Sequence, residues 1–186
     1  MKHFRKTIAL FLVVVMLTTT MGSTVLAGTE NQGFSDQAET TVDSRFLDGI
    51  DTDGYDYVIT SQEQADELRV SDDSKSILVA CGSVYLSGIT AGTITIRNTT
   101  KIQLSNVTAK ALDISQGTAI SFTGVKADQL LIAGEKTEES SLQIDSETNI
   151  SKLELNGGQA VTLEGSGTIG DVEVKEPVSS LAVYAT

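Results

Sequence analysis

Histidine, cysteine, tryptophan and proline are almost missing from this chain, and the first two absences exclude whole classes of protein. The 186 residues include one His, one Cys, one Pro and no Trp. A single Cys excludes a disulfide framework and a zinc site built on several thiolates. The one His is His3, in a segment that we expect to be removed. The remaining chain then has no imidazole, which excludes Ser-His-Asp triads, Cys-His dyads and histidine-bound metals.

The first 27 residues have the pattern of a secretory signal peptide. Lys2, Arg5 and Lys6 form a positive start, and an unbroken apolar run follows over residues 8–17. Such a run rises only about 15 Å as a helix, half of a bilayer core, so a removed signal is favoured over a permanent anchor. We expect cleavage after Ala27 and a secreted, extracellular or cell-surface location. No Cys follows the apolar run, which argues against a lipoprotein.

The charge balance argues against nucleic acids and anionic lipid surfaces as partners. The chain has 13 basic and 25 acidic residues, a formal net charge of −12. Removal of the signal leaves ten basic and 25 acidic residues, a formal charge of −15. Such a chain is repelled by DNA, RNA and anionic lipid surfaces. We therefore expect no nucleic-acid partner and no membrane span after cleavage, whereas carbohydrate, a surface protein or a divalent cation remain open.

Residues 28–56 predict a flexible acidic leader, since they contain few large apolar groups to bury. Within the leader, Asp51, Asp53 and Asp56 alternate near Gly54. Calcium binds several oxygens on one tight turn, so these aspartates are candidate metal ligands and calcium is a candidate cofactor. Tyr55 stands where a third ligand is expected, and no Glu closes the loop at the usual distance. A solvated acidic linker is the alternative.

A strand and a short helix are predicted between the leader and the rest of the chain. Tyr57 to Thr60 reads as extended, and the helix is expected over 62–69. Ser61 is placed to accept hydrogen bonds from the free amides of the first turn, and Gln64 stands at the reciprocal capping-box position. Turn-forming residues over 71–75 end this segment.

From residue 77 onward the apolar residues recur with a period of 18. The columns that hold this register over three copies are Val84/Ile102/Ile120, Leu86/Leu104/Phe122, Ile89/Val107/Val125, Ile94/Leu112/Leu130, Ile96/Ile114/Ile132, Ala91/Ala109/Ala127 and Gly88/Asn106/Gly124. Repeated columns of this kind are typical of a stacked repeat architecture. The Gly/Asn/Gly column predicts a bend at which one residue takes a positive φ.

A polar insertion over 134–140 interrupts the repeat, which then continues with a period of 19. The pairs predicted after the insertion are Leu142/Val161, Ile144/Leu163, Ile150/Ile169, Leu153/Val172 and Leu155/Val174. Leu181 and Val183 begin a last partial copy. Alternate residues of each short strand point inward, and only stacking buries them.

We therefore predict an all-β fold: a single-stranded parallel β-helix, or β-solenoid, with coils of 18–19 residues and an N-terminal capping helix. A β-sandwich of many short strands is the alternative, but it would not require a constant period. The predicted division is a signal peptide over 1–27, a flexible leader over 28–56, a capping strand and helix over 57–76, and the solenoid over 77–186.

Two features resemble right-handed parallel β-helix proteins of the pectin-lyase-like kind, which are secreted or displayed on cell surfaces. The first is the helical segment before Ser76–Ala80, and the second is the Asn-bearing bend at Leu104-Ser-Asn106-Val107. The resemblance covers about residues 58–186 and implies a right-handed coil with a helical cap. Eighteen residues per coil also suits left-handed hexapeptide β-helices, although Thr90, Thr108 and Lys126 break the hexapeptide rule. A calcium-binding β-roll also has 18 residues, but its Gly- and Asp-rich nonapeptides are missing.

Enzymes of that family cleave acidic polysaccharides with carboxylates on the outer face of the coils. Glu154 and Glu173 are 19 residues apart at outward positions, so we expect them to stack. Such a pair binds a cation or serves as acid and base, or consists of two solvated side chains. Asp113 has only Thr95 and Leu131 as its neighbours in adjacent coils, so no ladder of acids forms. We predict no catalytic residue and no cofactor-binding residue.

Three functions remain open at this point. The favoured one is a secreted or surface-displayed, non-catalytic β-helix protein with a structural, adhesive or binding role. The second is a polysaccharide-binding or weakly polysaccharide-active protein of the pectin-lyase-like kind. The third is a solenoid subunit that assembles through its uncapped C-terminal coil, because an open sheet edge invites pairing with another chain.

Overall fold

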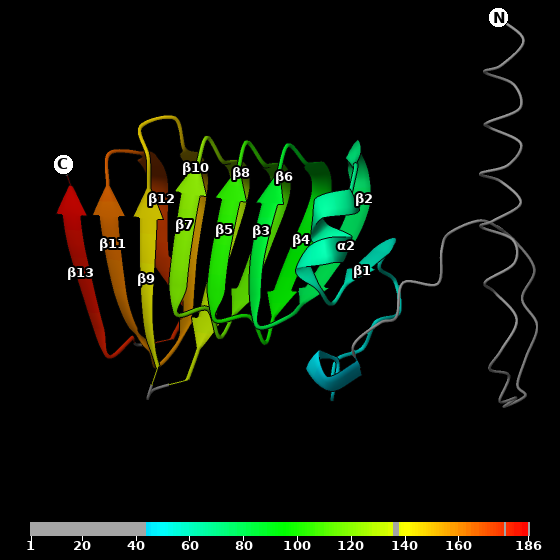
Figure 1. Cartoon of the computed structure of the whole chain (residues 1–186). Coiled ribbons are helices and arrows are strands. Elements are labelled where there is room, and N and C mark those ends of the chain that lie inside the picture. The colour runs from blue at the N-terminus through cyan, green and yellow to red at the C-terminus, as the bar shows by residue number, and fades with distance from the viewer. Residues whose placement is uncertain (1–43, 136–137, 177, 186) are drawn as a thin grey trace, which may run out of the picture. The chain divides into compact units, whose positions relative to one another are not determined.

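Strands that pair in parallel make up most of the computed structural model, which describes residues 44–135, 138–176 and 178–185 (Figure 1). The predicted signal peptide over 1–27 and the first part of the predicted leader, 28–43, lie outside the described residues. Two described elements are helical: the 3-10 helix η1 (Ser44–Phe46), before the first strand, and the helix α2 (Gln62–Glu67), between the first two strands. All the other described elements are strands.

The strands alternate between two sheets as the chain advances. One sheet follows the order β1 (Tyr57–Ile59), β2 (Ser71–Ala80), β4 (Thr90–Arg97), β6 (Thr108–Ser115), β8 (Lys126–Gly134), β10 (Asn149–Gly157) and β12 (Thr168–Val174). The other follows the order β3 (Ser83–Ser87), β5 (Lys101–Ser105), β7 (Ala119–Thr123), β9 (Glu139–Ile144), β11 (Ala160–Gly165) and β13 (Ser180–Ala185). From β2 onward each coil gives one strand to each sheet, so the prediction of an all-β parallel solenoid is confirmed.

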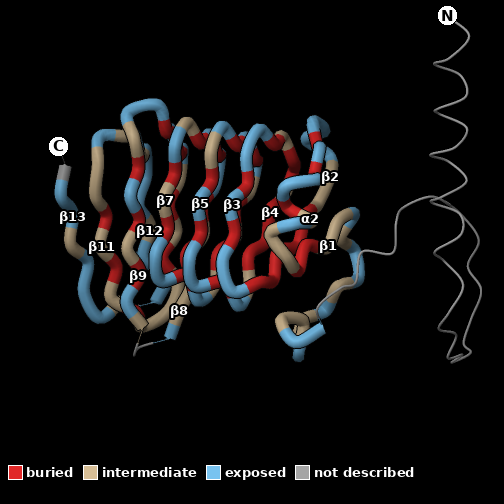
Figure 2. The backbone as a smooth tube through the Cα atoms, in the orientation of Figure 1, coloured by how far each residue is buried: buried red, intermediate tan, exposed pale blue. Residues whose placement is uncertain are grey.

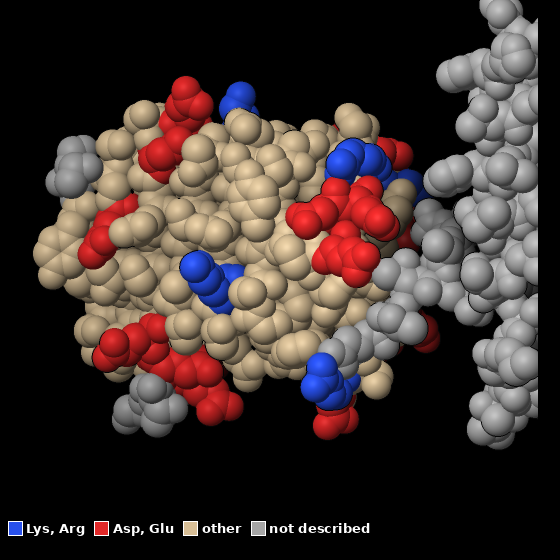
Figure 3. All heavy atoms as spheres, viewed as in Figure 1, with Lys and Arg blue, Asp and Glu red and all other residues tan. Residues whose placement is uncertain are grey.

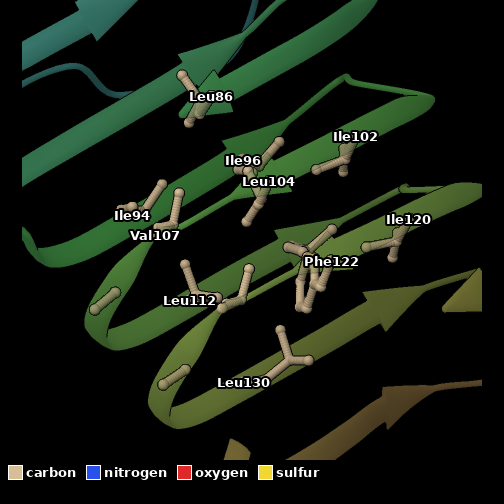
Figure 4. Close-up of a cluster of buried hydrophobic side chains, with 14 of the residues drawn as sticks. Leu86, Ile94, Ile96, Ile102, Leu104, Val107, Leu112, Ile120, Phe122 and Leu130 are labelled. Atoms are coloured by element: carbon tan, nitrogen blue, oxygen red, sulfur yellow. The ribbon is translucent and has the colours of Figure 1, made fainter. Parts of the chain in front are cut away.

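The core lies between the two sheets and is built from the predicted columns. Ile94, Leu112 and Leu130 are register partners in β4, β6 and β8, and each is at most 1% exposed. Figure 4 shows these side chains beside those of the facing sheet, such as Leu104 and Phe122. The buried positions run through successive coils as a continuous stripe (Figure 2). Because side chains alternate along a strand, each inward residue packs against the facing sheet and is covered along the stack by the coils above and below it.

The predicted bends have positive φ angles. The φ values are 68° at Gly88, 53° at Asn106 and 62° at Gly124. The Gly88 amide donates to the Ser105 carbonyl oxygen at 2.9 Å, and the Asn106 amide donates to the Thr123 carbonyl oxygen at 2.8 Å. The bends therefore continue the ladder from one coil to the next, at positions where Gly and Asn tolerate the left-handed conformation.

The register after the insertion differs from the prediction in one of the two sheets. In the sheet that begins with β1 and ends with β12, Ile150 of β10 pairs with Ile169 of β12, and Leu153 pairs with Val172, as predicted. In the other sheet, Leu142 pairs with Leu163, and Val161 pairs with Ser140. The predicted pairs Leu142/Val161 and Ile144/Leu163 are therefore wrong by two residues.

The two-residue error has a simple physical origin. A shift by two keeps every side chain on the same face of the strand, so apolar alternation cannot detect it. The column position that the prediction gave to an apolar side chain is held by Ser140, which is 4% exposed. Its hydroxyl donates to the Gly117 carbonyl oxygen at 2.8 Å, which satisfies the buried polar group.

The turn expected over 71–75 lies inside a strand. β2 pairs with β4 on both sides of these residues, but the register shifts between Asp72 and Ser76. The Asp72 carboxylate accepts hydrogen bonds from the Ser74 amide at 2.9 Å and the Ser74 hydroxyl at 2.7 Å. This local bonding produces a bulge, so the turn chemistry is present without ending the strand.

The described part of the predicted leader, residues 44–56, is attached to the solenoid rather than free. The Asn98 side-chain amide donates to the Phe46 carbonyl oxygen at 3.0 Å. The Asp56 carboxylate accepts from the Ser76 amide at 2.8 Å and lies 3.0 Å from the Lys75 ammonium. These polar contacts, which composition does not reveal, hold the segment against the first coils.

Candidate assembly surface

The first coil is closed at its outer end by β1 and α2. The predicted N-cap is present, because the Ser61 hydroxyl accepts from the Gln64 amide at 3.3 Å. The Gln64 side chain reaches back and accepts from the Thr60 amide at 2.6 Å. The helix ends at Glu67, two residues earlier than predicted, and buries Ala65 against the core. Leu68, which follows it, is also buried and belongs to the same core.

One side chain of this cap takes the place of a missing strand. β3 is the first strand of its sheet. The Gln62 side-chain oxygen accepts from the Tyr85 amide at 2.7 Å, and its side-chain nitrogen donates to the Tyr85 carbonyl oxygen at 2.9 Å. An amide side chain thus pairs with the backbone of the edge strand, which protects that edge against another chain. The sequence does not predict this role, since period-2 patterns describe the faces of a strand but not its edge.

The opposite end of the solenoid has no such cover among the described residues. Val172 and Val174 in β12 continue the inward columns of Leu153 and Leu155. The valines are 48% and 46% exposed, whereas both leucines are 0% exposed. The last coil thus presents inward-type side chains that no described coil covers.

The same contrast holds in the facing sheet. Leu181 and Val183 in β13 pair with Val161 and Leu163. They are 41% and 64% exposed, against 1% and 5% for their partners. Figure 2 shows β13, at the left, without buried segments. We call this end the assembly surface and define it as Val172, Val174, Leu181, Val183 and the neighbouring Tyr184, together with the outer edges of β12 and β13.

The assembly surface exposes enough apolar area for its burial to stabilise a complex. Covering half of a large aliphatic side chain contributes on the order of 1 kcal/mol, so its four aliphatic residues leave about 4 kcal/mol of apolar burial unused. The outer sides of β12 and β13 have no strand partner among the described residues. Exposed apolar patches beside open strand edges are typical of interaction surfaces.

The charges near the assembly surface are unequal on the two strands. β13 contains only Ser, Leu, Ala, Val and Tyr residues and therefore no charge. β12 contains Asp171 and Glu173. Figure 3 shows that the face of the solenoid turned to the viewer is mostly neither acidic nor basic, with acidic side chains gathered near its margins.

The predicted pair Glu154 and Glu173 does stack, since the two residues are register partners in β10 and β12. Their charges are, however, offset by lysines. The Lys152 ammonium lies 2.5 Å from Glu173 and 3.6 Å from Glu154, and Lys175 lies 2.5 Å from Glu173. The hydrogen bonds from Lys152 and Lys175 lower the pKa of Glu173 to about 2. The arrangement is an ion-pair cluster in which both carboxylates already have cationic neighbours.

The candidate calcium residues are engaged separately. The Asp51 carboxylate accepts from the Asp53 amide at 2.9 Å, and Asp56 bonds to Lys75 and Ser76 as described above. No cluster of three or more acidic, His or Cys side chains suited to a metal ion exists among the described residues. The structure therefore does not bring Asp51, Asp53 and Asp56 together as one ligand set.

A shallow groove crosses the starts of several strands. It has a volume of about 510 Å³, and Ala91, Ala109 and Ala127 contribute to its lining. Lys110 and Lys126 also line it. The Lys110 ammonium is 2.9 Å from Asp73, whereas Lys126 forms no ion pair with any described residue. The predicted alanine column thus contributes to the lining of this groove.

Comparisons of the chain with family models, with curated proteins and with solved structures found no match. None of the helices in the described part of the chain is long and apolar enough to cross a bilayer.

Proposed function

We propose that the chain is an exported, non-catalytic structural protein of the β-solenoid class that joins another protein end-on through the assembly surface. The observation that carries the proposal is the exposure of Val172, Val174, Leu181 and Val183 at positions that are buried in the preceding coil. Covering such a surface lowers the free energy, because the apolar side chains leave water and the two strand edges find hydrogen-bond partners. Among the described residues the inward side chains of the first coil are covered, so we expect the last coil to be the adhesive end of the solenoid.

Site-specific photocrosslinking in cells that export the protein tests this function. A benzophenone side chain at position 184 lies within the assembly surface, and one at position 85 provides the control. Tyr85 is 45% exposed but lies in β3, beside the cap. We expect protein adducts from position 184 and none from position 85. Absence of adducts from position 184, with folded protein in the medium, would contradict the proposed function.

Export is part of the proposal and has its own measurement. The signal-peptide pattern supports it, and cleavage after Ala27 would leave Gly28 as the first residue. N-terminal sequencing of the protein recovered outside the cell should begin at Gly28 or within a few residues of it. Recovery of the intact first segment in a cytoplasmic fraction would contradict export.

Polysaccharide binding is a second candidate, favoured by the groove over the alanine column and by the resemblance to pectin-lyase-like proteins. Lys126, which forms no ion pair within the described chain, is suited to an acidic sugar in the groove. Binding to acidic and neutral polysaccharides should be measured for the parent chain and for Lys126→Glu. Lys101→Glu, in β5 and outside the groove lining, is the matched control. A loss in the first variant alone would support this function, and binding unchanged by it would remove the groove from consideration.

A further inference from the structure

We infer that the partner of the assembly surface is a second copy of this chain, arranged by a two-fold axis so that β12 of each copy pairs antiparallel with β13 of the other. This inference rests on the proposed end-on function and names its partner. A partner that covers the assembly surface must provide both an unpaired strand edge and apolar side chains at alternate positions. The last coil of a second copy supplies both.

The opposite end of another copy does not fit this requirement. There the inward residues are buried beneath β1 and α2, and the backbone of Tyr85 is already bonded to Gln62. Head-to-tail stacking would first have to displace this cap. Two last coils meet without any such displacement, because neither has a cover among the described residues. A contact between identical surfaces also closes on itself, which yields a dimer rather than a filament.

Charge selects which strands pair. If β12 met β12 antiparallel, the register that aligns Val172 with Val174 of the second copy would place Glu173 opposite Glu173. Like charges directly opposite in a sheet are destabilising. β13 carries no charge, so pairing β12 with β13 avoids this repulsion between two acidic chains.

The facing of side chains limits the pairing to registers that keep inward residues inward. Among these, the register with Val172 opposite Val183 of the second copy and Val174 opposite Leu181 brings all four exposed aliphatic residues together. Glu173 then lies opposite Ala182, on the outer face. The two-fold axis makes the same ladder twice, and both open strand edges of each copy are paired.

Cysteine crosslinking tests this arrangement directly. The one native cysteine, Cys81, is 3% exposed, so any disulfide between two folded copies should come from the engineered cysteines. The double variant Glu173→Cys with Ala182→Cys should form a disulfide-linked dimer on mild oxidation. Within one copy the two positions belong to different sheets and cannot form a disulfide across the core. A mixture of the two single variants should crosslink as well, whereas each single variant alone should not.

Analytical ultracentrifugation of the protein purified from an exporting host supplies the second measurement. We expect a monomer–dimer equilibrium and no larger species. Val183→Lys should weaken dimerisation about tenfold or more, since it places a charge in the centre of the contact. Val183 is 64% exposed in the single chain, so the variant should keep its fold, which circular dichroism checks. Tyr85→Lys is the matched control and should dimerise like the parent.

Each contrary outcome overturns a named part of the inference. Crosslinking of Ala182→Cys alone would show β13 against β13, and crosslinking of Glu173→Cys alone would show β12 against β12. A ladder of higher oligomers would replace the closed pair by open stacking. A chain that is monomeric at all concentrations, yet crosslinks to a different protein from position 184, would overturn the second copy as partner and leave the proposed function standing. No adducts from position 184 would remove the function itself.

Discussion

Gly92 in β4 lies directly against Asp73 in the bulge of β2. A Cβ atom at position 92 would come within 2.6 Å of the Asp73 carbonyl oxygen. The bulge and the glycine are therefore one feature: the extra residues of β2 fold over the neighbouring strand only where that strand has no side chain.

Replacement of this glycine should be costly. We expect Gly92→Ala to lower the free energy of unfolding by about 2 kcal/mol or more, because backbone atoms must move to relieve the contact. Denaturant unfolding measures the change. Gly82→Ala is the matched control, because a Cβ there would meet the Phe46 ring at an ordinary 3.7 Å. Equal stability of the two variants would contradict the proposed role of Gly92.

Removal of the Gln62 side chain should loosen the first edge of the β3 sheet. Gln62→Ala deletes both hydrogen bonds to the Tyr85 backbone, and we expect a loss of about 1 kcal/mol in unfolding free energy. Hydrogen exchange at the Tyr85 amide should accelerate more than global stability requires. Gln143→Ala, which removes only an exposed bond to the Glu164 side chain, serves as control. An unchanged exchange rate at Tyr85 would show that Gln62 does not protect this edge.

Acid should weaken the attachment of residues 44–56 to the solenoid. The Ser76 backbone amide, followed by Lys75, lowers the pKa of Asp56 from 3.8 to about 2. The folded form therefore binds this proton less readily than the unfolded form, so the contribution of Asp56 to stability is present above about pH 4. It is lost as the pH falls toward 2.

The variant Asp56→Asn tests this dependence. Its stability should fall less steeply between pH 4 and pH 2 than that of the parent chain. Glu67→Gln is the control, because the exposed Glu67 side chain forms no hydrogen bond or ion pair within the described residues. Parallel profiles for Asp56→Asn and the parent would rule out Asp56 as the source of the acid sensitivity.

The thiol of Cys81 should be unreactive while the chain is folded. It is 3% exposed and donates to the Ser83 carbonyl oxygen at 3.3 Å, and burial raises its pKa. Little thiolate is then available for reaction with an aromatic disulfide reagent at pH 8. We expect slow labelling of the native protein and rapid labelling in denaturant. Rapid native labelling would mean that the first coil opens, and it would also remove the silent background that the crosslinking experiment needs.

The sequence predicted the inward columns of the first three coils because their spacing is constant and each column is apolar. It also predicted the bend at Asn106 and the N-cap of α2 at Ser61, where specific residue types have specific local roles. It placed the pairs after the insertion two residues out of register, because alternation is unchanged by such a shift. Ser140, a buried serine in an apolar column, resolves the register only once its hydrogen bond to Gly117 is known.

The candidate surfaces likewise include features that spacing in the sequence predicts and features that only the structure reveals. The stacking of Glu154 and Glu173 followed from their spacing, and Lys152 could have been added, because it lies two residues before Glu154 on the same outer face. The pairing of Gln62 with Tyr85 has no periodic signal, because it joins a helix side chain to the edge of a strand. The open last coil was expected from the sequence, but the degree of exposure of Val172 and Val183 required the structure.

Among the described residues the first coil is covered and the last coil is not, so the two ends of the solenoid should differ in how easily they unfold. Each strand pairs only with the strands of adjacent coils in its own sheet, so local fraying travels along one dimension. Among the described strands, fraying should start at β13, which pairs with one strand only and has its inward-type residues Leu181 and Val183 exposed. Under a pulling force applied along the solenoid axis, the coils would unfold one after another from this end. A second copy bound there would raise the force needed to unfold the last coil.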